Sequence, residues 1–187
     1  MGLGNPGPGY SGTRHNLGFR VIDELARRLG TRVIQKQGRA LVGRAVDPAD
    51  PGRAILLAKP QTFMNLSGRS ATALLATYKL KPGDLWAIHD ELDIPSGKLR
   101  IRLDGGAGGH NGVHSLIADL ATRDFARFRL GVGRPDSGDP ADWLLSEFPS
   151  AERERVDALV ALAADAVMEA LVDGIEISMN RHNGKVV

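Results

Sequence analysis

The sequence predicts a single-domain α/β protein, residues 1–187, in which a twisted, mixed central sheet is flanked by helices. Stretches with apolar residues at helical spacing alternate along the chain with short apolar stretches typical of strands. The turn-forming residues 47–52 join two of these strands into a hairpin, which adds antiparallel pairing. No repeat and no long linker divides the 187 residues, so one hydrophobic core is expected.

The expected helices are marked by their apolar spacing and by residues that favour helix ends. Gly30 and Gly174 are natural stops, and Ser150 is suited to cap a long helix. We expect helices at about 16–30, 67–78, 110–120, 150–172 and 175–181. We expect strands at 39–46, 53–59, 85–89, 98–103 and 125–132. The Gly-, Pro- and Asp-rich stretch 133–149 reads as a loop with a short helical piece.

Composition narrows the function classes. Hydrophobic residues make up 42% and charged residues 25%, which is typical of a protein in water. No apolar run approaches the ~18–20 residues of a membrane span, and no signal peptide is recognisable. The absence of cysteine excludes disulfides, thiolate nucleophiles and Cys-ligated zinc, and it fits a cytoplasmic location.

The net positive charge is small, but many of the basic residues lie in one stretch of the sequence. The net charge is only +2, but seven cations fall within residues 98–134. They are Lys98, Arg100, Arg102, Arg123, Arg127, Arg129 and Arg134. Solvated strand edges and a nucleic-acid surface both remain open as interpretations.

The glycine-rich start, residues 2–7, matches G-x-G-x-x-G. A dinucleotide site would need a strand before this motif and a helix opening inside it. Pro6 and Pro8 prevent that helix, so we interpret the stretch as a tight loop that presents Asn5.

A histidine and a carboxylate form the candidate catalytic pair. Asp90 ends an apolar strand, and ligands of open α/β sheets bind outside the carboxyl ends of strands. Strand alternation places His89 and Asp90 on opposite faces, so Asp90 needs another partner, and His15 is the candidate. A carboxylate on one ring nitrogen would make the other a general base, although His15 could also be structural. Neither G-x-S-x-G nor H-E-x-x-H occurs, so a His/Asp base acting on water is the simplest hydrolytic scheme.

Two further loops carry side-chain amides. Asn65 could bind a ligand or simply cap the following helix, and Met64 could be core or an apolar wall. Residues 105–112 are glycine-rich before a helix, which suits phosphate binding or a hinge, and Asn111 offers a donor and an acceptor there.

Five motifs together resemble bacterial peptidyl-tRNA hydrolases in order and spacing, from Met1 to about Asn183. They are residues 2–7, 13–16, 62–68, 89–93 and 108–112. The resemblance implies a monomeric α/β enzyme that needs no metal or other cofactor and acts on peptidyl-tRNA, with no membrane partner. A non-catalytic RNA-binding relative on the same scaffold is the alternative, although such a binder would have no need of a base.

The resemblance also implies residue roles. His15 would activate water, Asp90 would orient it, and Asn5 would contribute to catalysis by stabilising the oxyanion. The residues expected to bind the peptide and the tRNA 3′ end are Tyr10, Met64, Asn65, His110 and Asn111. Arg100, Arg102 and Arg129 would contact tRNA phosphates. Residues 133–149 resemble a mobile lid, and Asp104 stands where many relatives have glycine.

The beginning of the chain departs from the family pattern. Relatives usually carry a short apolar strand before this loop, whereas here Met1 leads straight into Gly2. We therefore expect the natural protein to start upstream of a misassigned start codon. A chain that starts at Met1 is expected to have a frayed sheet beside Asn5 and to melt early.

Overall fold

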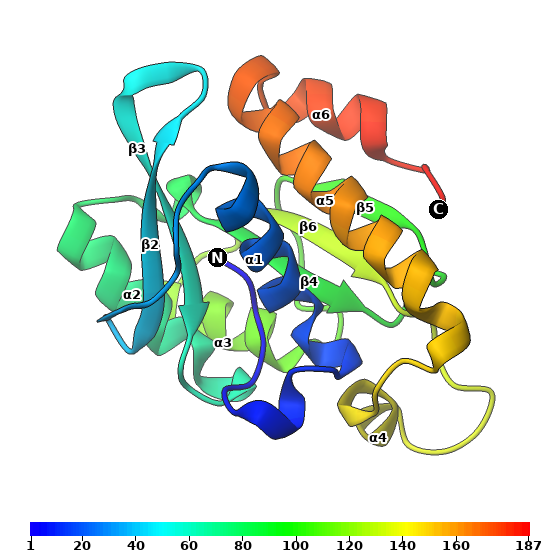
Figure 1. The fold of residues 1–187 in the computed structure, drawn as a ribbon. Coiled ribbons are helices and arrows are strands. Elements are labelled where there is room, and N and C mark those ends of the chain that lie inside the picture. The colour runs from blue at the N-terminus through cyan, green and yellow to red at the C-terminus, as the bar shows by residue number, and fades with distance from the viewer.

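The computed structural model describes residues 1–187 and has six α-helices and two three-stranded sheets, which confirms the α/β class (Figure 1). The helices are α1 (Leu17–Arg28), α2 (Ser67–Tyr78), α3 (Asn111–Leu120), α4 (Pro140–Leu145), α5 (Arg153–Asp173) and α6 (Ile175–His182). The strands are β1 (Gln35–Gln37), β2 (Ala40–Asp47), β3 (Asp50–Pro60), β4 (Trp86–Glu91), β5 (Leu99–Arg102) and β6 (Ala126–Gly131).

Most expected elements are confirmed within a few residues. The expectation that Ser150 caps the long helix is wrong, because Ser150 opens a 3₁₀ turn and α5 begins only at Arg153 without a side-chain cap. Gly174 does end α5, with a φ of 94° that favours glycine. The short β1 was not expected, since its three residues are all polar.

The two sheets meet through the first three residues of the chain. One sheet has the order β1-β2-β3 and is antiparallel, and the other has the order β4-β6-β5 with β4 parallel to β6. Gly2 N–H donates to Ala58 O of β3 at 3.0 Å, and Leu3 N–H donates to Ile88 O of β4 at 2.9 Å. The expected fraying beside Asn5 is therefore wrong, because Leu3 is hydrogen-bonded and fully buried.

Alternation along β4 divides the core between the two faces of its sheet. Ile88 packs in a large cluster with α1 and α5, while its neighbour Ala87 packs with α3 and Leu3 (Figure 1). Both faces of β4 are thus covered, and this strand is buried along most of its length. Its last residues, at the carboxyl end, carry the polar side chains His89, Asp90 and Glu91.

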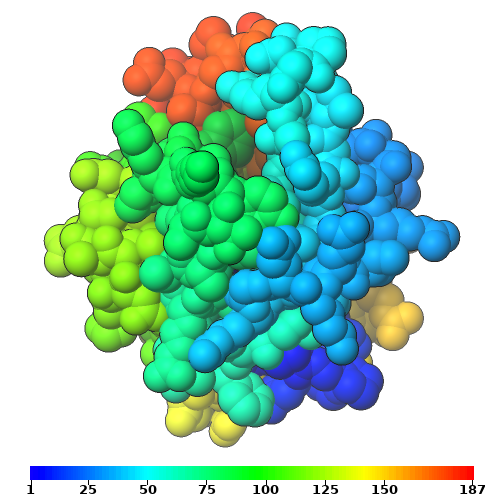
Figure 2. All heavy atoms as spheres, turned by 90° about the vertical axis from the view of Figure 1, so that its left-hand side faces the viewer, coloured from blue at the N-terminus to red at the C-terminus, as the bar shows by residue number.

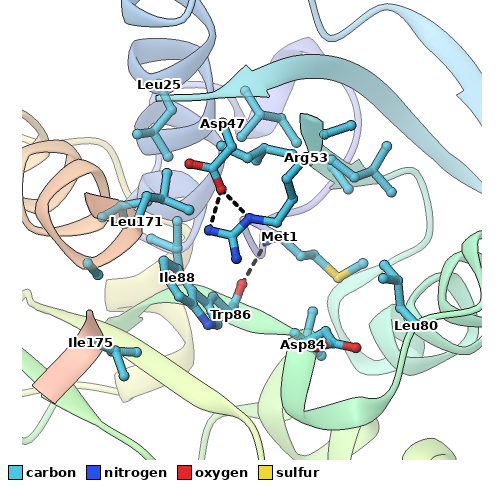
Figure 3. A pocket seen from close by; sticks show the side chains of 18 of the residues that line it. Met1, Leu25, Asp47, Arg53, Leu80, Asp84, Trp86, Ile88, Leu171 and Ile175 are labelled. Carbon is cyan, nitrogen blue, oxygen red and sulfur yellow. Dashed lines mark hydrogen bonds and ion pairs between the residues drawn. The ribbon is translucent and has the colours of Figure 1, made fainter. Parts of the chain in front are cut away.

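A cavity of about 670 Å³ opens at the opposite end of β4. Apolar residues of β3, α1 and the α5–α6 junction line most of it, with the Asp47–Arg53 ion pair at its edge (Figure 3). In the space-filling view it lies between the β2–β3 hairpin (cyan), the green segment after α2 and the orange end of α5 (Figure 2). The Met1 ammonium borders it and donates to Trp86 O at 2.7 Å. Burial lowers the pKa of this amine from 8.0 to about 5.

In a chain that begins at Met1, this buried amine predicts a pH-dependent free energy of unfolding. Between pH 5 and 8 the unfolded chain binds more protons than the folded one, so the free energy of unfolding should rise with pH. At about 1.4 kcal/mol per pK unit, a shift from 8.0 to about 5 corresponds to roughly 4 kcal/mol across the window. A Lys-Leu-Ile-Val leader before Met1 would convert the amine to an amide and bury aliphatic side chains in the cavity. We expect the leader to weaken the pH dependence and to raise the melting midpoint.

Urea unfolding at pH 5, 6, 7 and 8 would measure the pH dependence of the free energy of unfolding. Thermal unfolding would measure the melting midpoint. The intact mass is confirmed for each chain. A Lys-Ser-Gly-Ser leader is the matched control, because it removes the buried charge without supplying apolar side chains. It should weaken the pH dependence while raising the midpoint less. Identical curves for the chains with and without a leader would contradict the expectation.

Candidate active site

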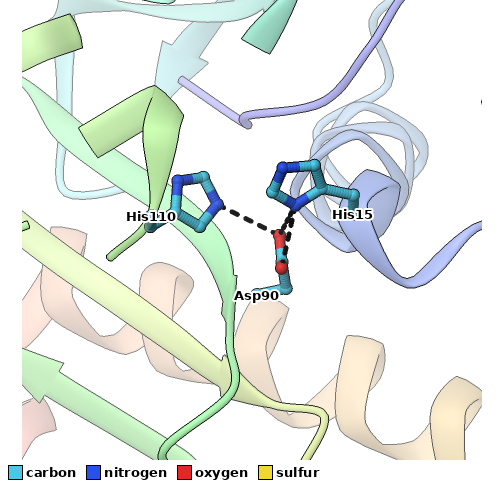
Figure 4. A group of neighbouring side chains, drawn as sticks. All are labelled: His15, Asp90 and His110. Atoms are coloured by element: carbon cyan, nitrogen blue, oxygen red, sulfur yellow. Dashed lines mark hydrogen bonds and ion pairs between the residues drawn. The ribbon is translucent and has the colours of Figure 1, made fainter. Parts of the chain in front are cut away.

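Three side chains from distant parts of the sequence meet at the carboxyl end of β4 (Figure 4). His15 Nδ1 lies 3.0 and 2.9 Å from the two carboxylate oxygens of Asp90, and His110 Nε2 lies 3.1 Å from Asp90 Oδ1. All three residues are buried. The predicted pairing of Asp90 with His15 rather than His89 is confirmed as geometry.

The hydrogen bonds of His110 fix where its proton lies. Its Nδ1 accepts from the backbone N–H groups of Gly112 at 3.1 Å and Val113 at 3.3 Å, and so caps α3. A neutral imidazole that accepts at Nδ1 carries its proton on Nε2, which here donates to Asp90. His15 also turns Nδ1 toward Asp90 and donates from it, so in the neutral ring Nε2 is the nitrogen that carries no proton. His15 is therefore better placed than His110 to take a proton.

The carboxylate between the two rings stays ionised. Burial alone would raise the pKa of Asp90, but the adjacent rings of His110 and His15, whose N–H groups donate to it, hold that pKa well below its usual range. The ring of His89 contacts the ring of His110 edge to face, with the two centroids 4.6 Å apart. Burial, and then the proximity of His110, lowers the pKa of His89 well below 6.5, so this third imidazole is neutral.

Asn5 is held in place by Asn16, the residue that follows His15. Asn16 accepts from Asn5 N–H at 2.8 Å and donates its own amide to Asn5 O at 2.9 Å. Asn5 Oδ1 accepts from Met64 N–H at 2.8 Å, which leaves its Nδ2 group available as a donor. Asn16 directly follows His15, and only the resemblance of residues 13–16 drew attention to it.

The remaining amide-bearing loops meet α3 from two sides. Met64 is buried and packs against Gly112, where an added Cβ would lie 2.5 Å from its sulfur. Asn65 is exposed in the 3₁₀ turn before α2 and makes no cap, so the capping interpretation of Asn65 is wrong. Asn111 is exposed at the first position of α3, and Tyr10 is half-buried at the end of the 3₁₀ turn Pro8–Tyr10.

The predicted arginines differ in their surroundings. Arg100 and Arg102 are exposed on β5, whereas Arg129 donates to the buried Glu91 carboxylate at 2.8 and 3.1 Å. Register places Arg127 directly opposite Arg102, and this residue is buried with Nε and Nη1 unpartnered. Strand register, which the sequence alone does not supply, brings these cations together on one face.

The donor set around Asp90 suits a hydrogen-bonded group better than a metal. The ligand-type atoms of His15, Asp90 and His110 all lie within 4.8 Å of one another. A metal on His110 Nε2 would move the ring proton to Nδ1, where it would face the N–H groups of Gly112 and Val113. Metal binding at this atom would therefore remove the cap of α3.

Comparison with known proteins decides the family. The model of the family described as peptidyl-tRNA hydrolase matches residues 1–187. The chain belongs to the peptidyl-tRNA hydrolase family. The peptidyl-tRNA hydrolase of Geobacter metallireducens is 48% identical over 99% of this chain and 94% of the relative. That of Brevibacillus brevis is 49% identical over 89% and 87%.

Solved structures agree with the family. A crystal structure of peptidyl-tRNA hydrolase from Acinetobacter baumannii has a TM-score of 0.89 and 33% identity, covering 99% of this chain and 93% of its own. A peptidyl-tRNA hydrolase crystallised with N-propanol has a TM-score of 0.90 and 34% identity, with the same coverage. No helix of this peptidyl-tRNA hydrolase is long and apolar enough to cross a membrane.

The geometry around His110 predicts the response to chelators. Because the cluster is held by hydrogen bonds, removing divalent ions should leave the rate of ester hydrolysis unchanged. Magnesium also shapes tRNA, so the measurement needs a minimal substrate, an N-blocked aminoacyl ester of adenosine, beside the full one. Loss of activity on the minimal substrate that only added zinc or magnesium restores would contradict the expectation.

Proposed function

We propose that this peptidyl-tRNA hydrolase cleaves the ester between a peptide, or an N-blocked amino acid, and the 3′-terminal ribose of tRNA with His15 as the general base. One observation carries the proposal. Nδ1 of His15 lies 3.0 and 2.9 Å from the two oxygens of the ionised Asp90 at the carboxyl end of β4, so Nε2 is the ring nitrogen that this carboxylate does not occupy.

The reaction follows from these positions. His15 Nε2 takes a proton from water as the water oxygen attacks the ester carbonyl, and Asp90 stabilises the resulting imidazolium. The Nδ2 group of Asn5 donates to the developing oxyanion, an interaction typically worth about 3–4 kcal/mol. The bond from carbonyl carbon to ribose oxygen then breaks, and the imidazolium returns its proton to that oxygen. Free tRNA and a peptide acid leave.

The exposed amides of Asn65 and Asn111 are suited to bind the peptide backbone and the tRNA 3′ end. Met64 and Tyr10 supply apolar and aromatic walls. His110 lines the cleft but acts as a second donor to Asp90 rather than as a base. We assign no step to a metal or cofactor.

The basic face of the β4-β6-β5 sheet is the proposed tRNA surface. Arg100 and Arg102 are free to contact phosphates, while Arg129 reaches the same face from its pairing with Glu91. Peptidyl-tRNA is the partner in this proposal, the enzyme acts as a cytoplasmic monomer, and residues 133–149 form a mobile lid beside the site. The oriented base favours an enzyme over an RNA-binding relative, because binding alone needs no such group.

The general-base role predicts the effect of His15→Ala. The exchange should lower kcat by about 10²–10⁴-fold and leave binding of the tRNA end nearly unchanged, since it removes only proton transfer. Asp90→Asn should also reduce kcat, because its amide group can present a donor to His15 and disfavour the productive tautomer. This loss should be smaller than that of His15→Ala, since the imidazole itself remains.

Release of free tRNA from an N-blocked aminoacyl-tRNA measures kcat and KM for each variant. His114→Ala is a matched control, because His114 lies on the exposed side of α3. Its kinetics should equal those of the parent enzyme. Near-normal turnover by His15→Ala would assign the base to another residue.

The phosphate role predicts different behaviour for the three arginines. Arg100→Glu and Arg102→Glu should raise KM for full tRNA far more than for the esterified adenosine. Each should also lower the slope of log affinity against log salt by roughly 0.7–0.9. Arg129→Glu should in addition destabilise the fold, because it places a second carboxylate beside the buried Glu91. Equal damage to both substrates by Arg100→Glu would show that Arg100 does not act through tRNA.

A further inference from the structure

Arg14 is a charged side chain that lies almost completely inside the protein, next to the proposed base. Only 1% of its surface is exposed, and it is among the largest fully buried side chains. It opens the 3₁₀ turn Arg14–Asn16, whose middle residue is His15. Burying a guanidinium is costly unless its donors find partners, so its contacts identify what it holds.

Those contacts lie in residues 143–152, more than a hundred residues away, and include an ion pair between Arg14 Nη2 and Glu152 at 3.9 Å. Arg14 Nη1 donates to Ser146 Oγ at 2.7 Å, to Glu147 O at 2.8 Å and to Ser146 O at 3.3 Å. The guanidinium carbon lies 3.5 Å from the ring centroid of Trp143 and 4.7 Å from that of Phe148. The planar group is thus stacked against two aromatic rings, an arrangement that lysine cannot reproduce.

The other attachments of the 139–148 segment are the packing of Leu144 and Phe148 against the main core and a bond from Trp143 Nε1 to Gly133 O at 3.0 Å. None of its residues is buried, and much of it is exposed. The backbone of this segment is also bonded to the 3₁₀ turn and the residue before it. Arg14 N–H donates to Ser146 O at 3.1 Å, and Thr13 forms a β-bridge with Glu147. The position of this segment is therefore linked to the backbone that carries His15.

Each residue of the 3₁₀ turn reaches a different part of the site. Arg14 holds the 139–148 segment, His15 holds Asp90 of β4, and Asn16 holds the loop that carries Asn5. We propose that Arg14 is a positioning residue for the hydrolysis. Arg14 binds the 139–148 segment to the turn that carries His15. The base is therefore correctly oriented only when that segment occupies the position seen here. This inference rests on the proposed role of His15.

The inference predicts a loss of rate without a loss of substrate binding. Arg14→Lys keeps the charge but not the stacked, forked group, and should lower kcat by about 10- to 100-fold, the range expected when a catalytic group is displaced by about an ångström. KM should change less than about twofold, since a side chain that is 1% exposed cannot touch the substrate. Trp143→Ala, which alters the other side of the contact, should lower kcat similarly and should add little to Arg14→Lys.

A double-mutant cycle separates this role from a general weakening of the fold. Arg14→Lys is combined with His15→Ala, and release of tRNA from an N-blocked aminoacyl-tRNA is measured for all four proteins. If Arg14 acts through the base, its exchange should leave the residual rate of His15→Ala unchanged. A normal rate for His15→Ala alone would instead overturn the proposed function, so the two failures are distinguishable.

Two further measurements complete the test. Arg14→Ala should regain part of its kcat in millimolar guanidinium, but not in sodium chloride of equal ionic strength. Arg28→Lys is the control, because Arg28 pairs with Asp165 of α5 and with Glu24 at the far end of α1 from the His15 turn. Its kinetics should equal those of the parent enzyme. Parental kcat in Arg14→Lys and Trp143→Ala, or an equal loss on both His15 backgrounds, would overturn the inference.

Discussion

The Asp90 carboxylate is the constraint around which the rest of the site is arranged. It is buried and ionised at the end of β4, so it must accept hydrogen bonds from groups that the fold brings to it. His15 and His110 supply them from elements on either side. The tautomer of each ring follows from that carboxylate, and the cap of α3 follows from the tautomer of His110. One buried charge thus orients two histidine rings and, through His110, the start of α3.

Around that charge, short polar segments perform the positioning that a packed core performs elsewhere. The turn Arg14–Asn16 contacts three separate parts of the chain through three consecutive side chains. Asn5, in turn, holds the Met64 backbone with its oxygen while its amide nitrogen remains free. Rigid polar contacts of this kind keep reacting groups in place without reorganisation, which is the condition for electrostatic stabilisation of a transition state.

Much of this could be predicted from the sequence, and the exceptions have physical reasons. Apolar spacing located the helices and main strands, and strand alternation separated Asp90 from His89 and paired it with His15. The polar strand Gln35–Gln37 gave no such signal, because edge pairing does not require apolar residues. Two further features depend on contacts between residues far apart in the chain. They are the ion pair of Arg129 with Glu91 and the hydrogen bonds of Arg14 with the 139–148 segment. Local patterns do not encode such contacts.

The junction made by Met1–Leu3 also sets an order of events during synthesis. These residues are synthesised well before their hydrogen-bond partners, Ala58 and Ile88. Closing so long a loop costs entropy that is recovered only when both partners are present. Residues 1–3 therefore remain without these partners while β2, β3 and α2 are synthesised. The two sheets can be joined only after β4 has left the exit tunnel, so the cluster of His15, Asp90 and His110 is assembled late in translation.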